Sequence, residues 1–237
     1  ALISIHWHHG CGLTATGAAY CWGYNGSGQI GDGTMYSTRM TPTLVSGSGS
    51  APLVFTQITV GAYHTCGLVG SGAVYCWGHN NIYQLGDGTT ADRATPTLVS
   101  GTGSAPLVFT QIASGYFHNC GITATGAAYC WGQNNYGQVG DGSGIDRSTP
   151  VLVSGSGSAP KVFTHIEAWS SNACAITGAG AAYCWGYNAE GYVGDGTPSL
   201  RYSPTLVTGS GSGSLVFTRL TSGSTACAMN AMGAVYC

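Results

Sequence analysis

The sequence predicts an all-β chain made of tandem units about 54 residues long, and three observations support this fold class. A segment of the form Cys-x9-Cys, followed in four of its five copies by Trp-Gly, begins at residues 11, 66, 120, 174 and 227. Stretches of alternating apolar and polar residues precede these segments, which is typical of half-buried strands. No stretch of useful length shows the 3.6-residue spacing of an amphipathic helix.

The repeated segment has the pattern of a β-hairpin. In the first copy, residues 11–23, two short strands flank a three-residue loop whose third position is Gly17. A loop of this length favours a residue of positive φ there, a conformation that glycine adopts without strain. Centring the hairpin on Thr16 places Cys11 opposite Cys21, so we expect a disulfide across the two strands.

Every hairpin has its two cysteines ten positions apart, so the same geometry pairs all ten cysteines. Directly opposed positions of an antiparallel pair have Cα atoms roughly 4.5 Å apart, a separation that a disulfide tolerates. Reduced or zinc-bound thiols are the alternative, but the C-x2-C spacing typical of zinc sites is absent. The expected disulfides are Cys11–Cys21, Cys66–Cys76, Cys120–Cys130, Cys174–Cys184 and Cys227–Cys237.

Three further parts complete each unit. An apolar strand precedes the hairpin, as at residues 53–58 and 107–112, and a glycine-rich turn follows it. A Thr-Pro-Thr-Leu-Val strand comes last, as at residues 95–99, and its proline suits an edge strand or a strand start. The unit therefore has the length and parts of one propeller blade. Gly/Ser-rich tracts join the units, and we expect surface loops there because one unit is too small to bury a core alone.

Composition narrows the class of protein. Only 6% of the residues are charged, against roughly 25% in ordinary soluble domains. Six Lys and Arg residues form no basic stripe, which argues against a nucleic-acid partner. No apolar run approaches the length of a membrane span. Ten paired cysteines predict an oxidising compartment, so we expect a secreted or cell-surface protein.

Charged residues recur at two positions of the unit. An Asp lies in the Gly-Asp-Gly turn, and an Arg follows six or seven residues later. This spacing predicts structural ion pairs that fix the turn to the next strand. Calcium bound by the Asp residues is the alternative, but the further carboxylates that such a site needs are missing. The predicted pairs are Asp32–Arg39, Asp87–Arg93, Asp141–Arg147 and Asp195–Arg201.

Three motifs resemble the regulator of chromosome condensation repeat. They are Gly-Ala-Tyr-His at residues 61–64, Tyr-Cys-Trp-Gly at residues 75–78, and the Asn-x-x-Gly-Gln-(Leu/Ile/Val)-Gly-Asp-Gly turn at residues 25–33. The resemblance covers nearly the whole chain and implies a β-propeller, most familiarly one with seven blades of four strands. The disulfides depart from the eukaryotic nuclear pattern and resemble a secreted bacterial branch of such repeats.

The motif departs from the family pattern at particular positions. Ile82 and Tyr83 replace the Ser-Gly step of the turn in the second copy, and Glu190 and Tyr192 alter the fourth. The family histidine matches His9, His64 and His118, whereas Asn172 and Thr225 stand at that position in the last two copies. We treat residues 1–237 as a single repeat domain of four full units and a partial fifth. The array is either a segment of a seven-bladed propeller or open, and open head-to-tail contacts form filaments.

Catalytic chemistry is not indicated. No nucleophile, base and orienting acid occur together, and no paired carboxylates form a recognisable glycosidase motif. On a strand, His6 and His8 share one face, an arrangement compatible with a zinc or copper site, but the sequence supplies no third fixed ligand. The alternative for these histidines is exposed imidazoles at a chain end. We therefore expect a protein that is not an enzyme and holds no metal or cofactor.

Aromatic residues fall into two sets. Trp22, Trp77, Trp131 and Trp185 follow a hairpin cysteine, so we expect each to pack over the disulfide of its own blade rather than to stack on sugars. Aromatic residues of the turns vary between units, and loops on a rigid scaffold commonly carry recognition. The candidate binding residues are Tyr24, His79, Tyr83, Tyr136, Tyr187 and Tyr192.

These observations lead to three hypotheses of function. Uniform, weakly charged repeats favour a structural component of an extracellular filament or surface assembly that acts through protein–protein contacts. The variable aromatic turns favour the alternative, a secreted recognition module such as an adhesin, a lectin or an enzyme inhibitor, with protein or carbohydrate as its ligand. The resemblance alone implies the third, guanine nucleotide exchange on a small GTPase, which an oxidising compartment disfavours. A propeller fold by itself does not choose among them.

Overall fold

The computed structural model describes residues 3–51, 53–105, 107–159, 161–211, 215–221 and 227–236. Within these ranges the chain forms nineteen strands in five antiparallel sheets and no helix, so no helix there is long and apolar enough to cross a bilayer. Four sheets have four strands in sequential order, and the fifth has three. The all-β prediction of four full blades and a partial fifth is confirmed.

The strands follow the same order in every blade, from the first strand to the outermost. Blade 1 contains β1 (Ile3–Ile5), β2 (His9–Leu13), β3 (Ala19–Gly23) and β4 (Arg39–Leu44), and blade 2 contains β5 (Phe55–Val60), β6 (His64–Val69), β7 (Val74–Gly78) and β8 (Arg93–Leu98). Blade 3 contains β9 (Phe109–Ser114), β10 (His118–Thr123), β11 (Ala128–Gly132) and β12 (Arg147–Leu152), and blade 4 contains β13 (Phe163–Trp169), β14 (Asn172–Thr177), β15 (Ala182–Gly186) and β16 (Arg201–Leu206). Blade 5 contains β17 (Phe217–Thr221), β18 (Cys227–Asn230) and β19 (Val235–Tyr236).

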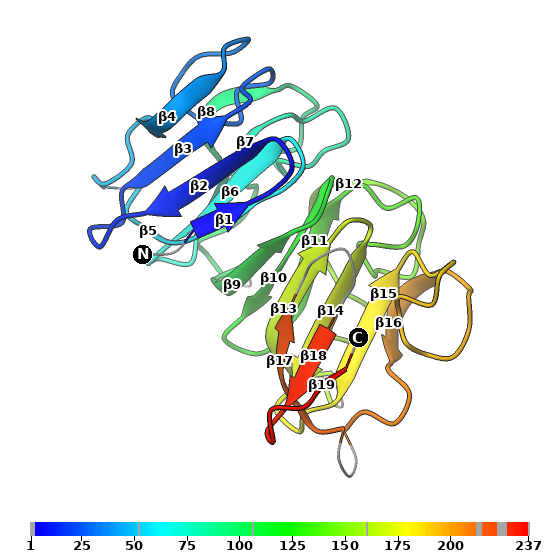
Figure 1. Cartoon of the computed structure of the whole chain (residues 1–237). Coiled ribbons are helices and arrows are strands. Elements are labelled where there is room, and N and C mark those ends of the chain that lie inside the picture. The colour runs from blue at the N-terminus through cyan, green and yellow to red at the C-terminus, as the bar shows by residue number, and fades with distance from the viewer. Residues whose placement is uncertain are drawn as a thin grey trace.

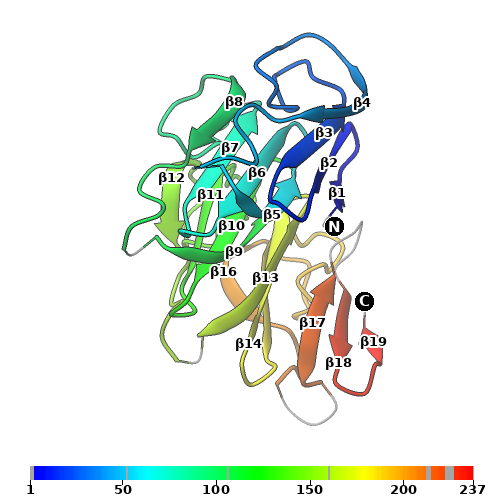
Figure 2. The ribbon, with the colours of Figure 1, turned by 90° about the vertical axis from the view of Figure 1, so that its left-hand side faces the viewer.

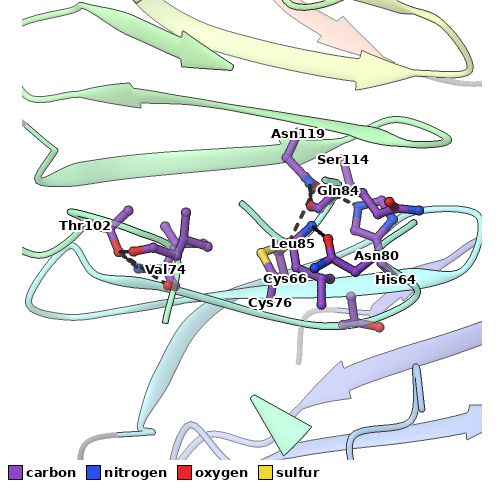
Figure 3. The surroundings of a disulfide bond; sticks show 12 residues. His64, Cys66, Val74, Cys76, Asn80, Gln84, Leu85, Thr102, Ser114 and Asn119 are labelled. Carbon is purple, nitrogen blue, oxygen red and sulfur yellow. Dashed lines mark hydrogen bonds between the residues drawn. A yellow bond between two sulfur atoms is a disulfide. The ribbon is translucent and has the colours of Figure 1, made fainter. Parts of the chain in front are cut away.

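The second and third strands of each blade form the expected hairpin. In blade 1, Cys11 faces Cys21, and Gly17 closes the loop with a φ of 78°. The first four predicted disulfides are present, each with a Cα–Cα distance of 4.1 Å. Of the fifth predicted pair, Cys227–Cys237, the second cysteine lies outside the described residues. Figure 3 shows the disulfide of blade 2 and its surroundings.

The Gly/Ser-rich tracts are ordered loops held against the hairpins. The Ser48 hydroxyl accepts a hydrogen bond from the Ala19 amide (3.1 Å) and donates to the Ala19 carbonyl (3.2 Å). Thr102 makes the same two bonds to Val74 in blade 2. The loop then closes through the backbone of Leu53, whose carbonyl accepts from the Gly49 amide. This closure explains why β5 begins at Phe55, two residues later than the sequence predicts.

The hydrophobic core lies between blades rather than inside them. Trp77 of blade 2 is fully buried in one cluster with Cys11 and Cys21 of blade 1, and its indole N–H donates to the Gln29 carbonyl at 3.0 Å. Trp131 and Trp185 pack in the same way on the disulfides of blades 2 and 3. The expectation that each Trp covers the disulfide of its own blade is therefore wrong. The indole is on the opposite sheet face and reaches the preceding blade.

The blades follow one another along a curve, with β4, β8 and β12 on the outer side (Figures 1 and 2). Consecutive first strands contact each other, namely β1 with β5, β5 with β9, β9 with β13 and β13 with β17. Residues of β1, β5, β9 and β13 line a central cavity of about 830 Å³. The proline-bearing fourth strands are edge strands, as the sequence predicts.

Candidate recognition surface

Aromatic side chains from three consecutive blades stack on one another. They belong to the turns that join each first strand to its second strand. The His8 ring lies on the Tyr63 ring with centroids 4.7 Å apart and an interplanar angle of 18°. Tyr63 in turn stacks on Phe117 at 6.2 Å and 14°. Each turn thus contributes one ring, and the rings form a continuous row across blades 1 to 3.

Two of the predicted binding residues complete this row. Tyr24 and His79 come from the turns after the third strands, and each meets Tyr63 edge-on with centroids 6.3 Å apart. A pocket of about 220 Å³ opens between them, lined also by Phe117 and Ile82. We call the set His8, Tyr24, Tyr63, His79 and Phe117 the aromatic rim. His8 and Tyr24 are exposed, and the other three are half-buried.

Backbone hydrogen bonds fix the aromatic rim. The Tyr24 amide donates to the His8 carbonyl at 2.8 Å, and the His79 amide donates to the Tyr63 carbonyl at 2.9 Å. The His79 ring is held further by Asp92, whose carboxylate lies 3.1 Å from Nδ1. The turn residues are therefore positioned by the same backbone contact in each blade. A preorganised surface of this kind loses little conformational entropy on binding.

A row of buried histidines supports the rim from below. Nε2 of His64 lies 2.9 Å from Oδ1 of Asn119 in the next blade, and the Ser114 hydroxyl donates to the same oxygen (Figure 3). The Asn119 amide group donates to the Gln84 carbonyl at 2.7 Å. His9 makes the equivalent contact to Thr65 at 2.8 Å. These contacts join consecutive blades directly beneath the turns.

Burial sets the ionisation of these histidines. Desolvation lowers the pKa of His9 to about 3, and the nearby His64 contributes further. The pKa of His64 falls to about 4 for the same main reason, although its bond to Asn119 partly opposes the shift. Desolvation also lowers the pKa of His118 to about 3. All three rings are therefore neutral at neutral pH, and the rings of His9 and His64 also act as hydrogen-bonding groups between blades.

The Asp and Arg residues of each turn lie together. Nε and Nη2 of Arg93 approach one carboxylate oxygen of Asp87 at 2.9 and 2.8 Å, and the other oxygen accepts from the Thr89 amide and hydroxyl. Burial alone raises the pKa of Asp87, but the bonds from Thr89 and Arg93 outweigh it and hold the pKa below its usual value. The same arrangement recurs in Asp32–Arg39, Asp141–Arg147 and Asp195–Arg201.

The remaining predicted binding residues lie elsewhere. Tyr136 meets Tyr187 edge-on at 5.3 Å, and Tyr187 lies 6.3 Å from Tyr192, so these three form a second cluster over blades 3 and 4. Tyr83 takes the glycine position of its turn with a φ of 61° and joins neither set of described ring contacts. The six predicted binding residues therefore lie in two separate clusters, with Tyr83 in neither.

The histidines near the chain start turn toward aromatic partners. The His6 ring meets Tyr116 edge-on at 5.1 Å, whereas His8 stacks on Tyr63. Within the part of the chain that the structure describes, no group of three or more His, Cys, Asp or Glu side chains is placed to hold a metal ion. The residues that sequence reasoning missed are His8, Tyr63 and Phe117. They share one signal, since each directly precedes the motif histidine and changes identity between repeats.

Comparison with known proteins places this geometry in a family. The profile described as "Regulator of chromosome condensation (RCC1) repeat" matches residues 16–68, 71–122 and 125–176, and a second profile of the same description matches residues 55–84 and 109–138. The probable E3 ubiquitin-protein ligase HERC4 of Homo sapiens is 30% identical over 211 residues, 87% of this chain and 19% of the ligase. The ultraviolet-B receptor UVR8 of Arabidopsis thaliana is 28% identical over 206 residues, 87% of this chain and 45% of the receptor. The chain thus spans less than half the length of these relatives.

Solved structures share the fold. Yeast RCC1 (Prp20), in a complex with Kap60, superimposes with a TM-score of 0.80 at 20% identity, covering 95% of this chain and 52% of that one. Human WBSCR16 gives a TM-score of 0.78 at 22% identity, covering 93% of this chain and 55% of that one. At these identities the likeness concerns the arrangement of blades.

Proposed function

We propose that this chain, which belongs to the regulator of chromosome condensation (RCC1) repeat family, is a non-enzymatic recognition module that binds a protein partner through its aromatic rim. The observation that carries the proposal is the stack of His8, Tyr63 and Phe117, flanked by Tyr24 and His79. Rings of this kind supply large contact areas with few rotatable bonds, and aromatic residues are enriched where proteins meet.

The chemistry of the rim favours a partner with an apolar or aromatic anchor. The pocket of about 220 Å³ between Tyr24, Tyr63 and Phe117 has room for a side chain rather than for a folded surface. His79 and Asp92 offer polar contacts at its edge. Because few charges surround the rim, we expect binding that changes little with salt concentration. One structure of the same fold, that of yeast RCC1, is likewise a complex with a protein.

Buried disulfides support an oxidising compartment. The eight cysteines of the four described disulfides are each at most 5% exposed, and they form the floor of every blade interface. Their reduction would remove cross-links that constrain the unfolded chain. We therefore propose that the module works in a secreted or cell-surface setting.

Selection of peptides from a random library, followed by affinity measurements, tests the proposal. We expect selected peptides to carry an aromatic or aliphatic anchor and to bind the Tyr63→Ala variant at least tenfold more weakly. Tyr136→Ala in the second cluster is the matched control and should bind as the unchanged chain does. Equal binding to the Tyr63→Ala variant would contradict the proposal, and recognition on a glycan array in place of peptides would assign the rim to carbohydrate.

End-to-end assembly is the second candidate, and a specific observation favours it. Ile3 and Ile5 of β1 are 62% and 68% exposed, whereas their counterparts in β5, Ile58 and Val60, are 2% and 4% exposed beneath the preceding blade. A further blade packed on β1 would cover these two side chains in the same way, and end-to-end assembly supplies that blade from a second copy. Electron microscopy of the unreduced protein decides this, since filaments with an axial repeat support assembly and single particles at all concentrations oppose it.

A further inference from the structure

The pocket of the aromatic rim has apolar walls and no ionic group in its lining. Tyr24, Tyr63, Phe117 and Ile82 form the walls, and none of the described lining residues is Lys, Arg, Asp or Glu. A charged anchor that entered this pocket would lose hydration without gaining an ionic partner among the lining residues. The composition of the pocket therefore favours an uncharged side chain of the partner.

The wall formed by Tyr24 depends on a glycine in the same turn. A Cβ atom at Gly26 would overlap the Tyr24 hydroxyl group, so the ring lies over its own turn because residue 26 has no side chain. Tyr187 occupies the same position in blade 4, where Ala189 replaces the glycine, and its ring lies edge-on to Tyr136 instead. The shape of the pocket is thus set by the residues of this turn.

A contact with Asp92 fixes which nitrogen of His79 a bound side chain can use. Nδ1 of His79 lies 3.1 and 3.3 Å from the two carboxylate oxygens of Asp92. A carboxylate only accepts hydrogen bonds, so Nδ1 carries the proton of the neutral ring and Nε2 keeps its lone pair. Within the described part of the chain, no hydrogen bond occupies Nε2. Because the ring lines the pocket, Nε2 is an acceptor for a bound group.

Ser27 adds a hydroxyl group to the same side of the pocket. Its oxygen lies 3.4 Å from Nδ1 of His79, so it can share the Nδ1 proton with Asp92 and still donate its own hydrogen. The Ser27 amide donates to Oε1 of Gln29 at 2.9 Å, which holds the residue in its turn. The polar side of the pocket therefore offers one acceptor and one donor. A phenol complements both, since it is an apolar ring with an O–H group that donates and accepts.

We propose that the pocket receives a tyrosine side chain of the partner, whose hydroxyl group donates to Nε2 of His79 while its ring packs on Tyr24 and Tyr63. This inference rests on the proposed function, because it assigns the partner's anchor at the rim. Phenylalanine would cover Nε2 without supplying a donor. An indole N–H donates, but it has no acceptor for the Ser27 hydroxyl. A phosphotyrosine would bring negative charge close to Asp92.

Peptides selected on the intact chain, and bound more weakly by the Tyr63→Ala variant, are the probe. Their anchor is replaced in turn by tyrosine, phenylalanine, O-methyltyrosine, tryptophan and phosphotyrosine, and calorimetry gives each Kd. We expect the tyrosine peptide to bind best and the phenylalanine and O-methyltyrosine peptides to bind about fivefold more weakly. The phosphotyrosine peptide should bind most weakly. Equal affinities of the tyrosine and phenylalanine peptides would overturn the inference.

A variant at His79 tests the acceptor directly. His79→Leu keeps an apolar wall, so it should weaken the tyrosine peptide about fivefold, leave the phenylalanine peptide unchanged and remove the preference. Gln133→Leu, at the same position of blade 3, is the matched control and should keep the preference. A preference that persists in His79→Leu contradicts the assigned role of Nε2.

The two proposals fail in different ways. If no selected peptide depends on Tyr63, the proposed function fails, and the assignment of tyrosine fails with it. If peptides depend on Tyr63 but bind equally with tyrosine and phenylalanine, only the assignment of tyrosine fails. The peptide series needs no variant of His79, so it decides the matter even if His79→Leu does not fold.

Discussion

At the scale of single residues, the buried histidines couple stability to pH. His9, His64 and His118 stay neutral in the folded chain, because their pKa values lie near 3 to 4, whereas an unfolded histidine has a pKa of 6.5. Between these values the unfolded chain binds more protons, so stability falls as the pH falls below 6.5. The turn carboxylates have pKa values lowered from 3.8, and their contribution is lost only in stronger acid.

We expect the free energy of unfolding to decrease between about pH 6.5 and pH 4, by about 1 kcal/mol per pH unit for each buried histidine. His64→Asn, which copies Asn172 of blade 4, should remove about one third of this slope. The check is urea unfolding across the pH range. His165→Gln at a half-buried site is the control. If the free energy of unfolding of the His64→Asn variant falls with pH as steeply as that of the unchanged chain, these rings do not cause the loss of stability in acid.

The ion pairs of the turns predict a second effect of single substitutions. The Asp141 carboxylate is 7% exposed and Arg147 is 33% exposed, so solvent screens part of their attraction. Asp141→Asn also weakens the bonds from Ser143. We expect a loss of about 1–2 kcal/mol in the free energy of unfolding. Thermal and urea unfolding measure it, with the exposed Arg219→Gln as a control that should change stability little.

At the scale of elements, the hairpins were predictable because their register depends on local geometry. Once Gly17 fixes the loop, the period of two places Cys11 opposite Cys21. The start of β5 was not predictable, since it depends on how Leu53 closes the preceding loop. The partner of each Trp was predicted wrongly for a related reason. One repeat shows which residues share a face, but not that this face packs on the neighbouring blade.

Because the indoles pack on the preceding blade, we expect two equivalent tryptophans to contribute differently to the free energy of unfolding. Trp131 is fully buried against blade 2, whereas Trp22 has no described blade before it and is half-buried. Trp131→Ala should cost about 3–5 kcal/mol in the free energy of unfolding, and Trp22→Ala should cost much less. Equal losses from the two variants, measured by urea unfolding, would mean that the indoles stabilise their own blades.

At the scale of the whole molecule, the arrangement of the blades brings equivalent turns of consecutive repeats together on one surface. Sequence variation indicated Tyr24 and His79 as candidate binding residues, but only the arrangement of the blades brings them to Tyr63. The same arrangement separates Tyr136, Tyr187 and Tyr192 from the rim. The oxidising compartment and the resemblance to a secreted bacterial branch of the repeat remain predictions that rest on the disulfides.

The most direct test of the aromatic rim is NMR mapping of a selected peptide on the isotopically labelled chain. We expect the largest shifts at His8, Tyr63 and Phe117, with smaller ones at Tyr24 and His79. Shifts that cluster instead on the outer strands β4, β8 and β12 would contradict the central claim that recognition occurs at the rim.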